Sequence, residues 1–196
     1  RLKEHFLTLG KLLGMKVVVV LTDGRQPIGN GIGPVLEAID VMKVLKNEPG
    51  APRDLREKSL MVAGELLEFV GSVQKGLGHQ VAREVLDSGD AYRKMMEIID
   101  AQGSHDIPPL PKFKQVFTAK KAGVVTEVNN KTVTKICRLA GAPVTRTAGM
   151  YLHKKYGDKV KKGETLFTAY AGSEHKLTQI ASYIKKENPY VIGKNA

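Results

Sequence analysis

The chain is poor in cysteine and lacks long apolar runs, and both absences limit what it does. Cys137 is the single cysteine among 196 residues, so no internal disulfide forms, in keeping with a reducing cytoplasm. No apolar run approaches the roughly 18 residues that cross a bilayer, and nothing at the start resembles a signal peptide. We therefore expect a cytoplasmic protein outside the membrane, with Cys137 as a small apolar side chain on a helix.

Aromatic residues make up only 6% of the chain, and its positive charge is unevenly placed. Residues 1–110 carry 14 Lys and Arg against 15 Asp and Glu, whereas residues 111–196 carry 17 against 5, a net charge of +12. A basic module suits nucleic acid, but the sequence holds no nucleic-acid motif and too few aromatics for base stacking. We therefore expect a lysine-rich surface and no nucleic-acid partner. The change in charge and the prolines at 108–111 predict a domain boundary between 1–110 and 111–196.

Hydrophobic periodicity in the first half predicts mainly helices. They are expected at residues 2–13, 34–45, 54–70, 79–86 and 90–102. The run Lys-Val-Val-Val-Val-Leu-Thr at residues 16–22 is typical of a strand buried on both faces, as in parallel sheets. A helix followed by a strand across Gly14 is half of a βαβ unit. The first half is therefore predicted to be the remainder of an α/β domain with a mostly parallel sheet.

After the prolines the pattern changes to strands that alternate with two helices. Strands are expected at residues 114–119, 123–128, 150–155 and 165–170. Helices are expected at residues 131–140, with Asn130 as the cap, and at 174–186. This order of elements predicts a small α+β domain.

A glycine-rich turn joins the predicted strand at 16–22 to the next helix. Residues 21–37 read Leu-Thr-Asp-Gly-Arg-Gln-Pro-Ile-Gly-Asn-Gly-Ile-Gly-Pro-Val-Leu-Glu. Pro34 stands where a dinucleotide fingerprint needs its last glycine, and no Gly-Lys-Ser/Thr follows, so neither NAD nor a Walker loop is predicted. Loop carbonyls together with Glu37 and Asp40, which share one helix face, suit a hard cation. The alternative is a tight turn beside two solvated carboxylates.

No other arrangement of residues predicts a catalytic site. The five histidines are scattered, without metal-ligand spacing: His5, His79, His105, His153 and His175. No Gly-x-Ser-x-Gly element is present. Residues 157–166 read Gly-Asp-x-Val-x-x-Gly-x-x-Leu and resemble the turn of biotinyl- and lipoyl-carrier sandwiches, which indicates a barrel-sandwich hybrid. The Met-Lys-Met tip of biotinylated carriers is absent, so carrier function is not expected.

Taken in order, several motifs resemble the C-terminal half of the thymidine/pyrimidine-nucleoside phosphorylase family, closest to its AMP phosphorylase branch. The main one is Thr-Asp-x-x-Gln-Pro-Ile-Gly-x-x-x-Gly-x-x-Leu-Glu-Ala at residues 22–38. The others are Leu-x-Gly-Met-Lys at 12–16, Ala-Gln-Gly at 101–103, Phe-Thr-Ala at 117–119, Gly-Val-Val-Thr-Glu at 123–127, and the Gly-Asp motif at 157–163. The chain is accordingly interpreted as the C-terminal part of a longer enzyme.

The resemblance implies a pentosyltransferase that uses inorganic phosphate to cleave the N-glycosidic bond of thymidine or other pyrimidine nucleosides, giving the free base and pentose 1-phosphate. One alternative is an AMP or nucleoside 5′-monophosphate phosphorylase, and another is a non-catalytic, carrier-like binding module. The family's phosphate loop and base-contacting residues precede the matching stretch, so no catalytic or substrate-binding residue is assigned and the isolated chain is expected to be inactive. The turn is expected to form the rim of a cleft whose other wall lies outside the chain.

The resemblance also implies a cation site and an oligomer. Some family members bind a monovalent or divalent cation through two carbonyls of this turn and a carboxylate on the next helix. The matching positions are Ile28, Gly31 and Asp40, although the family's carboxylate is typically Glu. No cofactor is expected to be required beyond phosphate as co-substrate and this K⁺ or similar cation. The partners implied are a nucleoside or nucleotide, phosphate and, in the intact enzyme, a second subunit of a homodimer.

Overall fold

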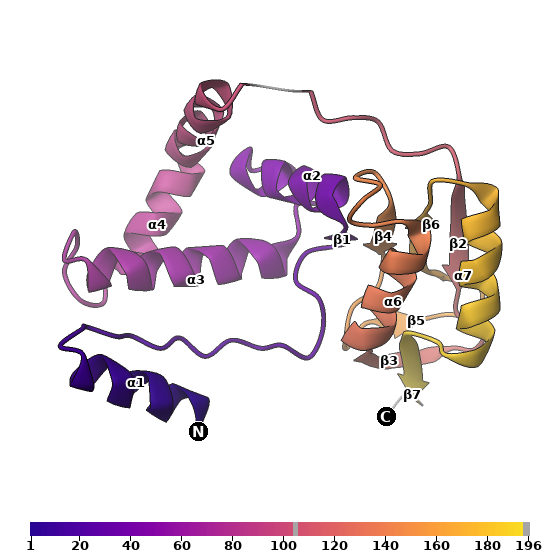
Figure 1. Ribbon diagram of the computed structural model, residues 1–196, viewed down its shortest axis with the longest axis horizontal. Coiled ribbons are helices and arrows are strands. Elements are labelled where there is room, and N and C mark those ends of the chain that lie inside the picture. Colours follow the sequence, from indigo (N-terminus) through magenta and orange to yellow (C-terminus); the bar gives the residue numbers. More distant parts are fainter. Residues whose placement is uncertain (104–105, 194–196) are drawn as a thin grey trace.

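The computed structural model describes residues 1–103 and 106–193, which form a helical part and a C-terminal α+β unit placed side by side (Figure 1). The helical part holds α1 to α5, and the C-terminal unit holds β2 to β7 with α6 and α7. None of the described helices is both long and apolar enough to cross a membrane.

The helices predicted in the first half are confirmed. They are α1 (Leu2–Leu12), α2 (Pro34–Leu45), α3 (Arg53–Phe69), α4 (Gly78–Asp87) and α5 (Asp90–Ala101). Pro34 begins α2 because a proline at the first helical position loses no hydrogen bond. The buried core of this part is small and consists of Val44, Leu60, Ala82 and Leu86.

The strand predicted at residues 16–22 is not formed. This segment is extended but pairs with no other strand. Two of its apolar side chains are exposed, Val18 by 53% and Leu21 by 74%, and its other valines are half-buried. A parallel strand needs neighbours that take up its backbone N–H and C=O groups, and α1 and α3 supply none. Every strand pair among the described residues is antiparallel, so the prediction of a parallel sheet is not confirmed.

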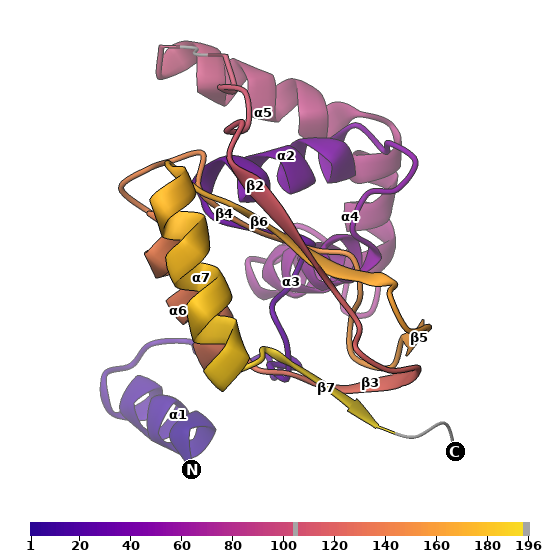
Figure 2. The same cartoon turned by 90° about the vertical axis from the view of Figure 1, so that its right-hand side faces the viewer.

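The C-terminal unit is the small α+β structure predicted. Its elements are β2 (Lys114–Thr118), β3 (Gly123–Val128), α6 (Asn130–Ala140), β4 (Gly149–Leu152), β5 (Lys159–Val160), β6 (Thr165–Tyr170), α7 (Glu174–Lys186) and β7 (Tyr190–Gly193). One antiparallel sheet has the order β1-β4-β6-β2 and the other β5-β3-β7. Figure 2 shows α6 and α7 together on one side of the strands. Its likeness to a barrel-sandwich hybrid stays a prediction.

The C-terminal unit holds the larger core. Phe167 on β6 stacks on Phe117 of β2, with ring centroids 4.7 Å apart, and on Tyr190 at 5.8 Å. Burial of such rings is a main source of stability. The side chain of Asn129 accepts from the backbone N–H of Thr132, so Asn129 caps α6 and the prediction of Asn130 was one residue late.

A short strand of the helical part completes the larger sheet. In β1 (Gly31–Ile32), Gly31 lies opposite Tyr151 of β4 and Ile32 opposite Met150. Through this pairing the turn before α2 is built into the C-terminal sheet, and this contact positions the candidate site. The domain division at residue 110 stays a prediction.

Candidate functional site

The glycine-rich turn, residues 23–33, lies between the extended segment and α2. Gly29 has φ 72° and Gly33 has φ 124°, backbone angles that favour glycine. Gly33 is also the N-cap of α2, and a Cβ at this position would lie 2.5 Å from the backbone oxygen of Ala148. The end of the turn is therefore held directly against the residue that precedes β4.

Asp40 supports the turn from inside. It is 1% exposed, and its Oδ2 accepts from the backbone N–H groups of Asn30 at 2.6 Å and Gly31 at 2.7 Å. The interpretation of Asp40 as a solvated helix residue is therefore wrong. Glu37 is exposed, and its Oε1 accepts from the N–H of Gly33 at 2.9 Å. Both carboxylates thus bind backbone donors that a tight turn leaves unpaired.

The three predicted cation ligands lie together. Ile28, Gly31 and Asp40 line one cavity of about 320 Å³. The Oδ1 of Asp40 is buried and has no hydrogen-bond partner among the described residues. The N–H of Leu152 donates to the carbonyl of Asn30, so the next pair, Gly31 and Tyr151, is a non-hydrogen-bonded pair of the antiparallel sheet. The carbonyl of Gly31 therefore points away from β4. These residues fit a cation, whose binding here stays a prediction. The described residues contain no cluster of three or more His, Cys, Asp or Glu suited to a metal.

The C-terminal unit also holds the outer side of the turn. Lys155, just after β4, donates from Nζ to the carbonyl of Pro27 at 2.8 Å and to that of Gly29. The N–H of Tyr156 donates to Oε1 of Gln26 at 2.8 Å. Sequence reasoning missed Lys155, because more than a hundred residues separate it from the turn and no spacing rule joins the two.

Charged side chains line the open side of the turn. Asp23 and Arg25 form an exposed ion pair with N–O distances of 2.7 and 3.0 Å, and the hydrogen bonds from Arg25 lower the pKa of Asp23 to about 2. A second cavity of about 320 Å³ is bordered by Asp23, Gln26, Asp54, Glu57 and Lys58, among others. The turn therefore has a polar, accessible face as well as a buried one.

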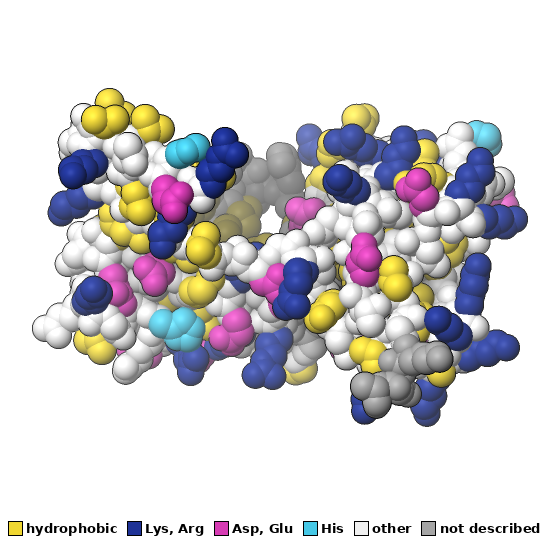
Figure 3. All heavy atoms as spheres, turned by 90° about the horizontal axis from the view of Figure 1, so that it is seen from below, with side chains coloured by type: hydrophobic (Ala, Val, Ile, Leu, Met, Phe, Trp, Pro, Cys, Tyr) yellow, Lys and Arg dark blue, Asp and Glu magenta, His cyan; other side chains and the backbone are white. Residues whose placement is uncertain are grey.

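The lysine-rich character of the C-terminal unit is visible on its surface. In Figure 3 dark blue side chains surround the right-hand lobe, which is that unit. The histidines among the described residues belong to no cluster that could hold a metal ion. His153 contacts Thr168 Oγ1 at 2.9 Å, and burial lowers the pKa of His153. His105 lies outside the described residues.

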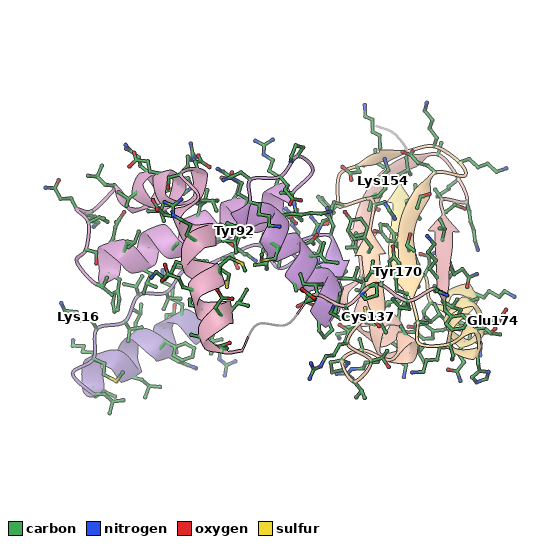
Figure 4. All side chains as sticks on the ribbon, turned by 90° about the horizontal axis from the view of Figure 1, so that it is seen from above. Lys16, Tyr92, Cys137, Lys154, Tyr170 and Glu174 are labelled. Atoms are coloured by element: carbon green, nitrogen blue, oxygen red, sulfur yellow. The ribbon has the colours of Figure 1, made fainter. Side chains whose placement is uncertain are left out.

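Cys137 lies on α6 beside the junction of the two parts (Figure 4). It is buried, as predicted, and burial raises the pKa of its thiol to about 12. We expect its reaction with a disulfide reagent at about pH 8 to be roughly a thousandfold slower in the folded protein than in denaturant, because thiolate is the reactive form. The folded-state rate should rise with pH. A folded-state rate within roughly tenfold of the unfolded rate would contradict this assignment.

Comparison with known proteins adds independent information. Residues 124–191 match the family model of the pyrimidine nucleoside phosphorylase C-terminal domain. The chain is 47% identical, over 98% of its length, to a protein of Rhodopseudomonas palustris named "Putative thymidine phosphorylase". Proteins of the same name from Bradyrhizobium sp. and Legionella pneumophila are 48% and 41% identical over 98% and 100% of the chain. The chain spans 38% of the length of each of these relatives.

Proposed function

We propose that the chain is part of a nucleoside phosphorylase, a proposal supported by the match of residues 124–191 to the family model of the pyrimidine nucleoside phosphorylase C-terminal domain. In this reaction an oxygen of inorganic phosphate bonds to the anomeric carbon of the pentose as the N-glycosidic bond breaks and the base leaves. The observation that carries the proposal is similarity along nearly the whole chain to relatives that bear a phosphorylase name.

The geometry of the turn agrees with the proposed role as one wall of a cleft. The turn has two cavities beside it, and Leu21, a large apolar side chain that lines one of them, is exposed by 74%. Exposed apolar surface of this kind commonly lies against another part of a protein. We propose that a phosphate- and nucleoside-binding part of the enzyme covers it. In this proposal the residues that contact the substrates lie outside this chain.

The chain's own contribution is to hold the wall in shape. Asp40 fixes the amides of the turn, and Lys155 fixes its carbonyls. We propose that Ile28, Gly31 and Asp40 also hold a K⁺ or similar cation, through two backbone oxygens and the unpartnered Oδ1 of Asp40. Such an ion would supply positive charge beside a phosphate site. No other cofactor is proposed.

Two substrate classes remain within the proposal. Thymidine and other pyrimidine nucleosides are the first, in line with the names of the relatives. Nucleoside 5′-monophosphates such as AMP are the second, in line with the AMP phosphorylase-like motifs of the turn. We further propose a cytoplasmic enzyme, homodimeric when intact. The carrier-like binding module, without catalysis, is the alternative that the activity test must exclude.

The test compares the chain alone with a longer protein that includes the upstream portion found in its relatives. We expect the longer protein to release free base and pentose 1-phosphate from thymidine or uridine, or from AMP, CMP or UMP, only when phosphate is present. Residues 1–196 alone should give no product above the blank. Product from the isolated chain would place the catalytic residues here, and no product from the longer protein with any of these substrates would overturn the proposed function.

A further inference from the structure

The ammonium group of Lys155 lies among oxygen atoms from two distant parts of the chain. Its side chain is 18% exposed, although it belongs to the lysine-rich unit. Nζ donates to the carbonyls of Pro27 and Gly29 and lies 3.0 Å from Oδ2 of Asp54, the second residue of α3. Two of the three N–H donors of the ammonium group are thus taken up by backbone carbonyls, and the Asp54 carboxylate adds an ion pair.

The oxygens around Lys155 make up the ligand set of a hard cation. Two backbone carbonyls and one carboxylate are typical ligands of such ions. The carbonyl of Gly29 points away from Asp40 because it belongs to the same trans peptide group as the N–H of Asn30, which donates to Asp40. The carbonyl dipoles and the Asp54 carboxylate together favour positive charge at this point.

The backbone that carries Lys155 is itself fixed. The N–H of Lys155 donates to Oδ2 of Asp158 at 2.7 Å, and the N–H of Asp158 donates back to the carbonyl of Lys155 at 3.1 Å. Gly157, with φ 89°, closes this turn. Lys154, labelled in Figure 4, instead pairs with Glu164 of its own unit at 2.5 Å. Of these two adjacent lysines, Lys154 pairs within its own unit and Lys155 contacts the glycine-rich turn.

We propose that Lys155 is the built-in cation of the turn. Its ammonium fills a monovalent-cation site formed by Pro27, Gly29 and Asp54, and thereby fixes the turn against the C-terminal unit. Removal of the side chain leaves a site that a free K⁺ or ammonium ion occupies. This inference does not depend on the proposed phosphorylase activity. In the proposed enzyme Lys155 is a positioning residue, since it contacts the wall of the cleft.

The test measures Tm in choline chloride, whose cation is too large for the site, and in KCl at the same ionic strength. In choline chloride Lys155→Ala should lower Tm by about 5 °C or more. KCl should restore at least about half of this loss, a gain beyond any response of the wild type. Lys154→Ala, the matched control, should respond to K⁺ as the wild type does. Lys155→Met fills the space with an uncharged chain, so it should be destabilised without regaining Tm in K⁺.

Each remaining outcome decides the question. A Lys155→Ala protein that folds only in KCl supports the proposal, whereas one that is unfolded in both salts overturns it. Equal K⁺ responses in the wild type and Lys155→Ala also overturn it. In crystals of Lys155→Ala soaked in Tl⁺, an anomalous peak between the carbonyls of Pro27 and Gly29 is expected. If the only anomalous peak lies beside Asp40, Tl⁺ does not bind in the place of the Lys155 ammonium, and the inference is refuted.

Discussion

Replacing Asp40 with alanine is expected to lower the free energy of unfolding by about 4 kcal/mol, because one buried and one half-buried amide lose their acceptor and each unpaired group costs roughly 1–3 kcal/mol. The affected donors are the N–H groups of Asn30 and Gly31, at 2.6 and 2.7 Å from Oδ2. The Asp40 side chain that accepts these bonds is 1% exposed. For a chain of this size the loss is equivalent to a Tm lower by about 10 °C, measured by calorimetry or circular dichroism.

Two variants separate this role from general effects. Asp40→Asn keeps an acceptor oxygen of the same size and should lose about half as much stability. Asp100→Ala removes an exposed carboxylate near the end of α5 and should change stability by no more than about 0.5 kcal/mol. If Asp40→Ala proved as stable as Asp100→Ala, the turn would not depend on Asp40.

The same variants test the proposed cation at Ile28, Gly31 and Asp40. If Oδ1 of Asp40 is a ligand, K⁺ should raise the Tm of the wild type relative to choline chloride, and Asp40→Asn should weaken this response. A wild type that does not respond to K⁺ removes the cation but leaves the hydrogen bonds of Asp40 in place. Failure of the cation proposal is therefore distinguishable from failure of the structural role.

Gly33→Ala is the second substitution with a large expected effect, about 3–5 kcal/mol of lost stability. Its φ of 124° is strained for any residue with a side chain, which costs of order 1–3 kcal/mol. In addition, the new Cβ would lie 2.5 Å from the backbone oxygen of Ala148, so the turn must separate from the residue before β4. Amide exchange should report that separation: the N–H of Leu152, which donates to the carbonyl of Asn30 at 2.7 Å, should exchange faster.

Gly76→Ala is the matched control, because Gly76 has a φ of 90° but no atom within 4 Å of the place that a Cβ would take. The stability of Gly76→Ala should fall by only about 1–2 kcal/mol, the cost of a positive φ for alanine. The amide exchange rate of Leu152 should stay unchanged. Equal losses in the two variants would mean that the close approach of Gly33 to Ala148 contributes nothing.

Local patterns predicted the helices and the longer strands well. The helix that begins at Pro34 and the strand Gly123–Val128 follow from a proline start signal and from β-branched residues. The same reasoning failed at residues 16–22, where a valine-rich run is extended but unpaired. A strand exists only beside another strand, and periodicity in one segment carries no information about its neighbour. Strands β1 and β5 were missed because runs of two residues give too little pattern; β7 was missed as well, although it is as long as the predicted β4.

The candidate site was predicted in part. Asp40 was identified because its spacing from Glu37 puts two carboxylates on one helix face near the turn. Sequence could not say that Asp40 is buried and binds amides while Glu37 is exposed, since burial depends on what covers the helix. Lys155 was not identified at all. Its contacts to Pro27 and Gly29 join positions that are 128 and 126 residues apart.

The amino-acid pattern alone establishes the helices, the glycine turn and the resemblance to a phosphorylase family, because these depend on residues close together in the chain. Only the folded chain decides that β1 joins the C-terminal sheet, that Asp40 faces inward, and that Lys155 supplies a cation to the turn. These features arise where backbone donors and acceptors from distant segments meet, away from water. Their partners are chosen by packing of the two parts against each other, which no local sequence rule encodes.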